Sequence, residues 1–193
     1  LLAIGYAATP EAPAMADRLV DEVGDADTPV AAYVWYCAGE AAMAVDTERA
    51  RERLARAVDL ATITNTAFVR GVAGASKASI ESRTGDPAAA AADYAWLIPH
   101  WRRAGMWPTQ WTMLRSIVGL LERLGRPREA AVLEGAVRSP SAGHLIFGAD
   151  EQALREIGDR LRSALGDEAY ELARREGAEL DGDGAAELAL RSL

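Results

Sequence analysis

The sequence predicts an all-α fold, an α-α superhelix in which helical hairpins stack on one another, and two observations lead to this prediction. The first is an internal repeat. Gly85-Asp86-Pro87 recurs as Gly125-Arg126-Pro127, and Ala90-Ala91 recurs as Ala130-Ala131, 40 positions later in both cases (125 − 85). A related turn, Val45-Asp46-Thr47, lies 40 positions upstream of the first one. A period of this length with two helical patterns is typical of hairpins that bury their apolar faces against their neighbours.

The second observation is the composition. Half of the residues are hydrophobic but only 6% are aromatic, and alanine is abundant whereas β-branched runs are scarce, which favours helices that pack closely through small residues. The balance of 21 basic against 29 acidic residues gives a net charge of −8. This charge would repel a phosphate backbone, so we expect no direct nucleic-acid partner.

Cysteine usage and hydropathy indicate the compartment. Cys37 is the single cysteine, which excludes an internal disulfide and a multi-cysteine metal site and favours a reducing environment. No apolar run reaches the roughly 18 residues needed to cross a bilayer, and the N-terminus lacks the layout of a signal peptide. We therefore expect a cytoplasmic protein without a membrane partner. Because the chain begins inside an apolar run at Leu1, we also expect it to be a piece of a longer polypeptide.

Cap and spacing signals predict the helices of the first half. Thr9-Pro10 and Thr28-Pro29 each supply an N-cap followed by a proline at the first helical position. After Asp46, small and apolar residues recur with the spacing of an amphipathic helix. A glycine-weakened helix follows. The predicted ranges are 9–23, 28–45, 46–62 and 66–84.

The second half is more strongly patterned. Pro99 lies inside a predicted helix and removes a backbone hydrogen bond, so we expect a kink there. The helix that begins at Trp107-Pro108 carries two apolar stripes, which indicates two packed neighbours, and the stripe that includes Trp107 and Trp111 is typical of core. The predicted ranges are 87–104, 107–124, 127–138, 150–165, 167–176 and 182–192.

These helices suggest three segments. Residues 1–138 are predicted to form the hairpin repeats, 139–148 an apolar connecting loop, and 149–193 a C-terminal helical cap, which a stack needs at its end. The loop contains Leu145-Ile146-Phe147. Burying each of these side chains is worth roughly 1.5 to 3 kcal/mol. We therefore expect the loop to dock between the last hairpin and the cap, while a mobile linker or a contact with another subunit is the alternative.

Six short segments of the second half share a common likeness: His100 to Gly105, Gln110 to Thr112, Leu121 to Gly125, Leu165 to Tyr170, Arg175 to Ala178, and Ala185 to Leu190. Together they resemble the C-terminal helical region of large actinobacterial ATP-dependent transcriptional regulators, including those with LuxR-type DNA-binding domains or linked cyclase domains. The resemblance covers roughly residues 86–193 and implies a tetratricopeptide-like module beside an ATPase, which senses a signal or binds a partner. No phosphate loop, cyclase motif or helix-turn-helix occurs in the sequence, so no catalytic residue is transferred.

An aromatic cluster supplies the candidate binding groove. Five large rings fall between Tyr94 and Trp111, and such rings line either a core or a ligand groove. Trp96 and His100 lie one helical turn apart and are predicted to face a concave surface, with basic residues nearby that suit an acidic partner. The candidate groove residues are Tyr94, Trp96, His100, Arg102 and Arg103.

The sequence offers no catalytic or metal-binding constellation. His100 and His144 have no ligand-forming neighbours at metal spacing, and Lys77 lacks the glycine pattern of a phosphate loop. We therefore expect no enzymatic activity and no cofactor. The first hypothesis is a binding module whose partner is another domain of the parent protein, a separate protein or peptide, or a small-molecule signal. The alternative is a structural or dimerisation arm.

Overall fold

The computed structural model describes residues 11–24, 26–142, 146 and 148–193. In this part of the chain all regular structure is helical, with α-helices and one short 3-10 turn and no strand, so the all-α prediction is confirmed. None of the described helices combines the length and the apolar character that crossing a membrane requires. The predicted cap at Thr9-Pro10, and the side chains of His144, Leu145 and Phe147, lie outside the described residues.

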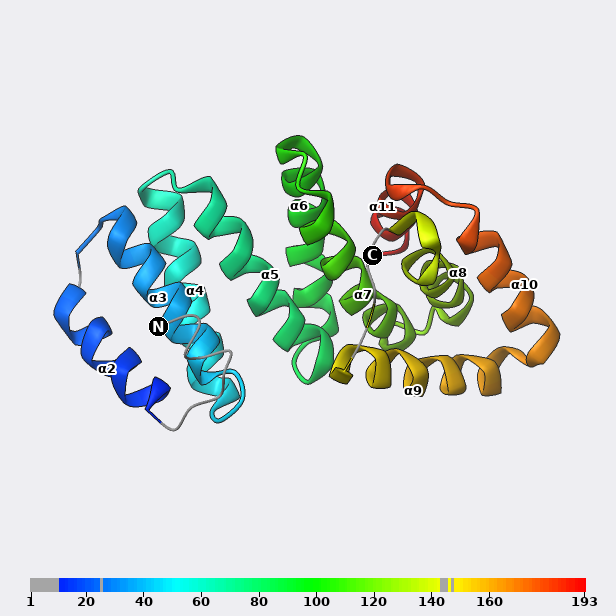
Figure 1. Ribbon diagram of the computed structural model, residues 1–193, viewed down its shortest axis with the longest axis horizontal. Coiled ribbons are helices and arrows are strands. Elements are labelled where there is room, and N and C mark those ends of the chain that lie inside the picture. The colour runs from blue at the N-terminus through cyan, green and yellow to red at the C-terminus, as the bar shows by residue number, and fades with distance from the viewer. Residues whose placement is uncertain (1–10, 25, 143–145, 147) are drawn as a thin grey trace. The chain divides into compact units, whose positions relative to one another are not determined.

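The chain forms two compact units, Leu1–Ile80 and Glu81–Leu193, and the boundary falls within helix α5. Each is described by itself below, as the N-terminal unit and the C-terminal unit (Figure 1). The N-terminal unit contains α2 (Ala12–Val23), α3 (Pro29–Ala42), α4 (Thr47–Ile63) and most of α5 (Ala67–Arg83). The C-terminal unit contains α6 (Pro87–Ala104), α7 (Trp107–Arg123), α8 (Pro127–Arg138), the 3-10 turn η1 (Pro140–Ala142), α9 (Gly148–Leu165), α10 (Asp167–Ala178) and α11 (Gly182–Ser192).

In the N-terminal unit, α3 packs against both α2 and α4. The predicted caps are present: Thr28 Oγ1 accepts a hydrogen bond from Ala31 N at 3.1 Å, and Asp46 Oδ1 accepts one from Arg49 N at 3.0 Å. Small residues bring the helices together. The side chain of Leu54 fills the space beside Gly39, where a Cβ would lie only 2.7 Å from Leu54 Cγ.

In the C-terminal unit, α7 is the central helix and packs against α6, α8, α9 and α11 (Figure 1). Both predicted apolar stripes of α7 are buried between Trp111 and Leu121, which confirms that the helix has neighbours on more than one side. The prediction of core is correct for Trp111, which is 5% exposed, and wrong for Trp107, which is 37% exposed. Trp107 lies in the first turn of α7, where fewer neighbouring helices cover it than in the middle of the helix.

The two repeated turns of this unit lie side by side. Arg123, at the end of α7, donates hydrogen bonds to the carbonyl oxygens of Glu81, Ser82 and Gly85 at 2.7 to 2.9 Å. These carbonyls belong to the C-terminal end of α5 and to the turn that follows. A guanidinium group is well placed there, because the last carbonyls of a helix lack partners within the helix and carry a partial negative charge.

Helices α8 and α10 approach until their backbones touch. A Cβ at Gly177 would lie 1.8 Å from the carbonyl oxygen of Val132, and one at Gly135 would lie 2.1 Å from that of Arg174. Only glycine permits this approach, since any side chain at either position would overlap the facing backbone.

A buried carboxylate joins α8, α9 and α10 beside this contact. Glu134 is 1% exposed and accepts hydrogen bonds from Tyr170 Oη at 2.8 Å and from Arg138 Nε at 2.9 Å. Burial, followed by the hydrogen bond to Glu134, raises the pKa of Tyr170 to about 12. Gly158 of α9 leaves room for the pair, because a Cβ there would lie 2.8 Å from Tyr170 Oη.

The substitution Gly177→Ala tests the backbone contact. We expect it to lower the free energy of unfolding by roughly 1 to 3 kcal/mol or more, because α10 must move away from α8 to make room for the methyl group. Gly184→Ala is the matched control, since its Cβ meets only the flexible side chains of Leu180 and Asp181 at 3.2 to 3.3 Å. Equal urea midpoints for the two variants would contradict the proposed constraint.

Candidate functional site

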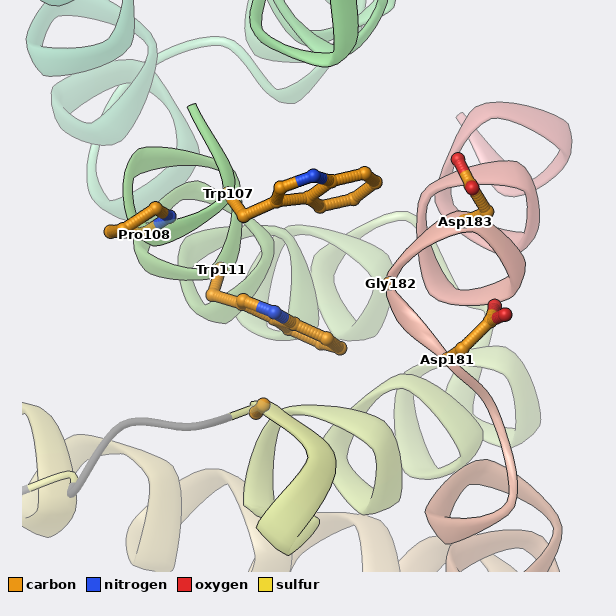
Figure 2. Close-up of a pocket in the computed structure, with 7 residues that line it drawn as sticks. Trp107, Pro108, Trp111, Asp181, Gly182 and Asp183 are labelled. Atoms are coloured by element: carbon orange, nitrogen blue, oxygen red, sulfur yellow. The ribbon is translucent and has the colours of Figure 1, made fainter. Parts of the chain in front are cut away.

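The candidate site is a pocket of about 410 Å³ in the C-terminal unit, where the first turn of α7 faces the N-terminus of α11 (Figure 2). Its volume lies within the range of about 300 to 1,000 Å³ that is usual for ligand pockets. The described residues that line it are Trp107, Pro108, Trp111, Ala142, Asp181, Gly182 and Asp183.

Two tryptophans of α7 form its aromatic side. Pro108 lies in the first turn of α7, where a missing backbone N–H costs nothing. Trp107 and Trp111 are one helical turn apart, so their side chains leave the same side of the helix. Figure 2 shows both indole rings projecting from successive turns towards α11. Trp111 is almost fully buried, whereas Trp107 remains accessible to a ligand.

The opposite side is the start of α11. Asp181 is the N-cap, and its Oδ1 accepts a hydrogen bond from Gly184 N at 2.8 Å. Asp183 Oδ1 accepts a hydrogen bond from the Nη2 of Arg102 on α6 at 2.6 Å. Between the two carboxylates, Gly182 lies against the ring of Trp107, since a Cβ there would be 2.8 Å from Cζ3 of that ring.

The rim of the pocket is negatively charged. Asp181 and Asp183 lie at the start of α11, across the pocket from the aromatic pair (Figure 2), and Glu187 follows on α11, 3.9 Å from the guanidinium of Arg102. Two carboxylates, those of Asp183 and Glu187, therefore flank the guanidinium of Arg102. Among the described lining residues there is no serine, cysteine or histidine to serve as a nucleophile or a base pair. The arrangement is suited to binding a group that is both apolar and positively charged.

The predicted groove residues fall in different environments. Tyr94 is fully buried in the core, and burial raises its pKa to about 12. Trp96 and His100 are half-buried and meet edge to face, with ring centroids 5.9 Å apart. Arg103 is exposed, and only Arg102 reaches the pocket, through its contact with Asp183. The prediction that Trp96 faces a partner stays a prediction.

The sequence alone does not predict that these residues line one pocket. Asp181 is the N-cap directly before the predicted helix 182–192, but its position opposite Trp107 does not follow from the sequence. The two residues are 74 positions apart (181 − 107). No spacing rule links positions this distant, so the only sequence signal was the pair of tryptophans one turn apart at the start of a helix.

A second cavity, of about 420 Å³, lies in the N-terminal unit and includes three arginines of α4. These arginines already have acidic partners. Asp17 pairs with Arg53 and, at 2.8 Å, with Arg49, and Asp27 lies 3.9 Å from Arg56. The hydrogen bond from Arg53 is the main cause of the lowered pKa of Asp17. With Glu52, which also lines this cavity, three acidic residues balance the three arginines, so the charge of the cavity favours no ligand.

Comparison of the chain with protein-family models, with curated proteins and with solved structures finds no match. The pocket and its charges are therefore the main basis for inferring a function.

The substitution Gly182→Ala tests the geometry of the pocket. We expect the added methyl group to displace the ring of Trp107 and therefore to change the chemical shift of its indole N–H. The free energy of unfolding should change by less than about 1 kcal/mol, because the first turn of a helix accepts alanine. Ala185→Gly is a control on the same helix. An unchanged Trp107 signal in the Gly182→Ala variant would contradict the contact.

Proposed function

We propose that this chain is a non-catalytic binding module of a multidomain cytoplasmic regulator, and that the Trp107–Trp111 pocket holds part of a protein partner. The observation that carries the proposal is the pocket itself, in which an accessible indole and a buried one lie across from the two aspartates at the start of α11. Tryptophan is enriched among residues that dominate binding energy, because it offers a large rigid surface.

The resemblance to actinobacterial regulators supports the regulatory part of the proposal. It falls on the unit that contains the pocket, and it implies a module that passes a binding event to an ATPase or a DNA-binding domain outside this chain. The net charge of −8 is consistent with a protein partner and disfavours direct contact with nucleic acid.

A structural or dimerisation arm is the second candidate function. It is favoured by exposed apolar side chains on α3, where Val30 is 67% and Tyr33 44% exposed, one turn apart. A dimer through this face predicts a molar mass that rises with concentration and falls to that of the monomer in the Val30→Lys variant. A monomer at every concentration tested would exclude dimerisation.

The binding function is tested with a panel of blocked tripeptides, Gly-X-Gly, in which X is each natural amino acid. Indole N–H signals in the NMR spectrum are assigned by single Trp→Phe substitutions. We expect at least one peptide to shift the signals of Trp107 and Trp111 in a saturable manner, while Trp35, which belongs to the N-terminal unit, does not respond.

Two outcomes would count against this function. Absence of any saturable shift of Trp107 and Trp111 up to millimolar peptide would contradict it. Equal responses from Trp35 and Trp107 would indicate non-specific association. Trp107→Ala is the loss-of-binding variant, because Trp107 is partly exposed and its removal disturbs the core less than removal of Trp111.

A further inference from the structure

We propose that the group bound in the Trp107–Trp111 pocket is the cationic side chain of a lysine or arginine in the partner, and that Arg102 competes with it for Asp183. This inference rests on the proposed binding function and specifies the chemistry of its ligand. Three features of the pocket carry it: the aromatic wall, the uneven charge of the rim, and an internal guanidinium that already occupies part of that rim.

The aromatic wall provides the first attraction. A cation is drawn to the face of an aromatic ring by the ring quadrupole, and tryptophan is the strongest of the three aromatic residues in this respect. The ring of Trp107 is 37% exposed and projects from the first turn of α7 towards α11 (Figure 2). The apolar stem of a lysine or arginine side chain would lie along the same rings while its charged end reaches the rim.

The charges of the rim exclude an anion. The N-terminus of a helix favours negative groups, and α11 begins at the pocket, but Asp181 at the N-cap and Asp183 in the first turn already supply two negative charges there. Asp181 uses Oδ1 for its cap bond, and among the described residues its Oδ2 accepts no hydrogen bond. A second anion would be repelled, whereas a cation finds a carboxylate oxygen available.

Arg102 shows that this rim accepts a guanidinium. Its Nη2 lies 2.6 Å from Asp183 Oδ1 and 3.9 Å from Glu187 Oε1, and its side chain is 29% exposed. A ligand cation therefore shares Asp183 with Arg102 or displaces it. Loss of the Arg102 charge leaves Asp183 available and makes the rim more negative, so it should strengthen binding of the ligand cation. This is the opposite of the usual effect of removing a charged residue beside a binding site.

The size of the pocket favours a side chain carried on a polypeptide. At about 410 Å³ and open on one side, it has room for one long side chain together with its flanking backbone. A small free ammonium ion would fill little of this space and would contact fewer ring atoms. We therefore assign the cation to a protein segment.

The experiment measures the dissociation constants of four blocked peptides, Gly-Lys-Gly, Gly-Arg-Gly, Gly-norleucine-Gly and Gly-Glu-Gly, and of tetramethylammonium. For the wild-type chain we expect the Lys and Arg peptides to bind about tenfold more tightly than the neutral norleucine peptide, with the difference reduced at high salt. The Glu peptide should bind most weakly, and tetramethylammonium more weakly than the Lys peptide.

Variants then identify the groups responsible. Trp107→Ala and Asp181→Asn should each weaken binding of the Lys peptide by about fivefold or more, and Arg102→Gln should strengthen it by about threefold to tenfold. Arg103→Gln, an exposed neighbour on the same helix, is the matched control and should change nothing. Arg102→Lys keeps a cation at the rim and should retain wild-type affinity, which separates the effect of charge from any effect on α11.

The outcomes separate this inference from the function on which it rests. Norleucine binding as tightly as lysine would overturn the cation assignment while the binding function stands. Binding of tetramethylammonium as tight as that of the Lys peptide would overturn the assignment to a side chain. Weaker binding by Arg102→Gln, with thermal stability unchanged, would overturn the competition. No saturable binding of any probe or of the wider panel would overturn both the inference and the function.

Discussion

The contact between the backbones of α8 and α10 is the constraint on which the C-terminal unit depends. Gly135 and Gly177 leave no space for a side chain between the helices, so the position of α10 is fixed against α8. Ser139 extends this contact beyond the end of α8, since its Oγ donates a hydrogen bond to the carbonyl oxygen of Ala178 at 3.1 Å. The short connection to α11 begins directly afterwards. The backbone contact therefore determines where the acidic rim of the pocket lies.

The buried Glu134 specifies how α8, α9 and α10 pack together. A carboxylate removed from water is costly unless its oxygens are paired, and here they receive the hydroxyl of Tyr170 and the guanidinium of Arg138. Arg138 also reaches Glu151 of α9 at 2.9 Å. A different register of α8 against α10 would separate Glu134 from Tyr170, and a different register against α9 would separate Arg138 from Glu151. The network thus specifies one arrangement of these three helices.

Several residues that line the pocket or its rim also stabilise the fold. Asp181 caps α11, Asp183 and Arg102 attach α11 to α6, and Trp111 belongs to the core. Trp107 is the exception, because it remains partly exposed although its ring is large and apolar. Burial of such a ring is favourable, so an exposed tryptophan beside two carboxylates is a surface on which a partner gains energy. In the proposed function, this combination makes the pocket a site for recognition.

The sequence by itself determined the helices and many of their ends. Caps such as Thr28 and Asp46, prolines in first turns, and apolar spacing act within a few residues, so they are readable from the chain alone, and they identified the all-α class and the buried stripes of α7. The tertiary structure decided the site. Tyr94 is in the core and Trp107 faces α11, because the choice between core and surface for a large ring depends on which helix covers it. For Trp107 the covering helix is α11, which follows α10, and α10 is held against α8 by the close approach at Gly135 and Gly177, which no local pattern encodes.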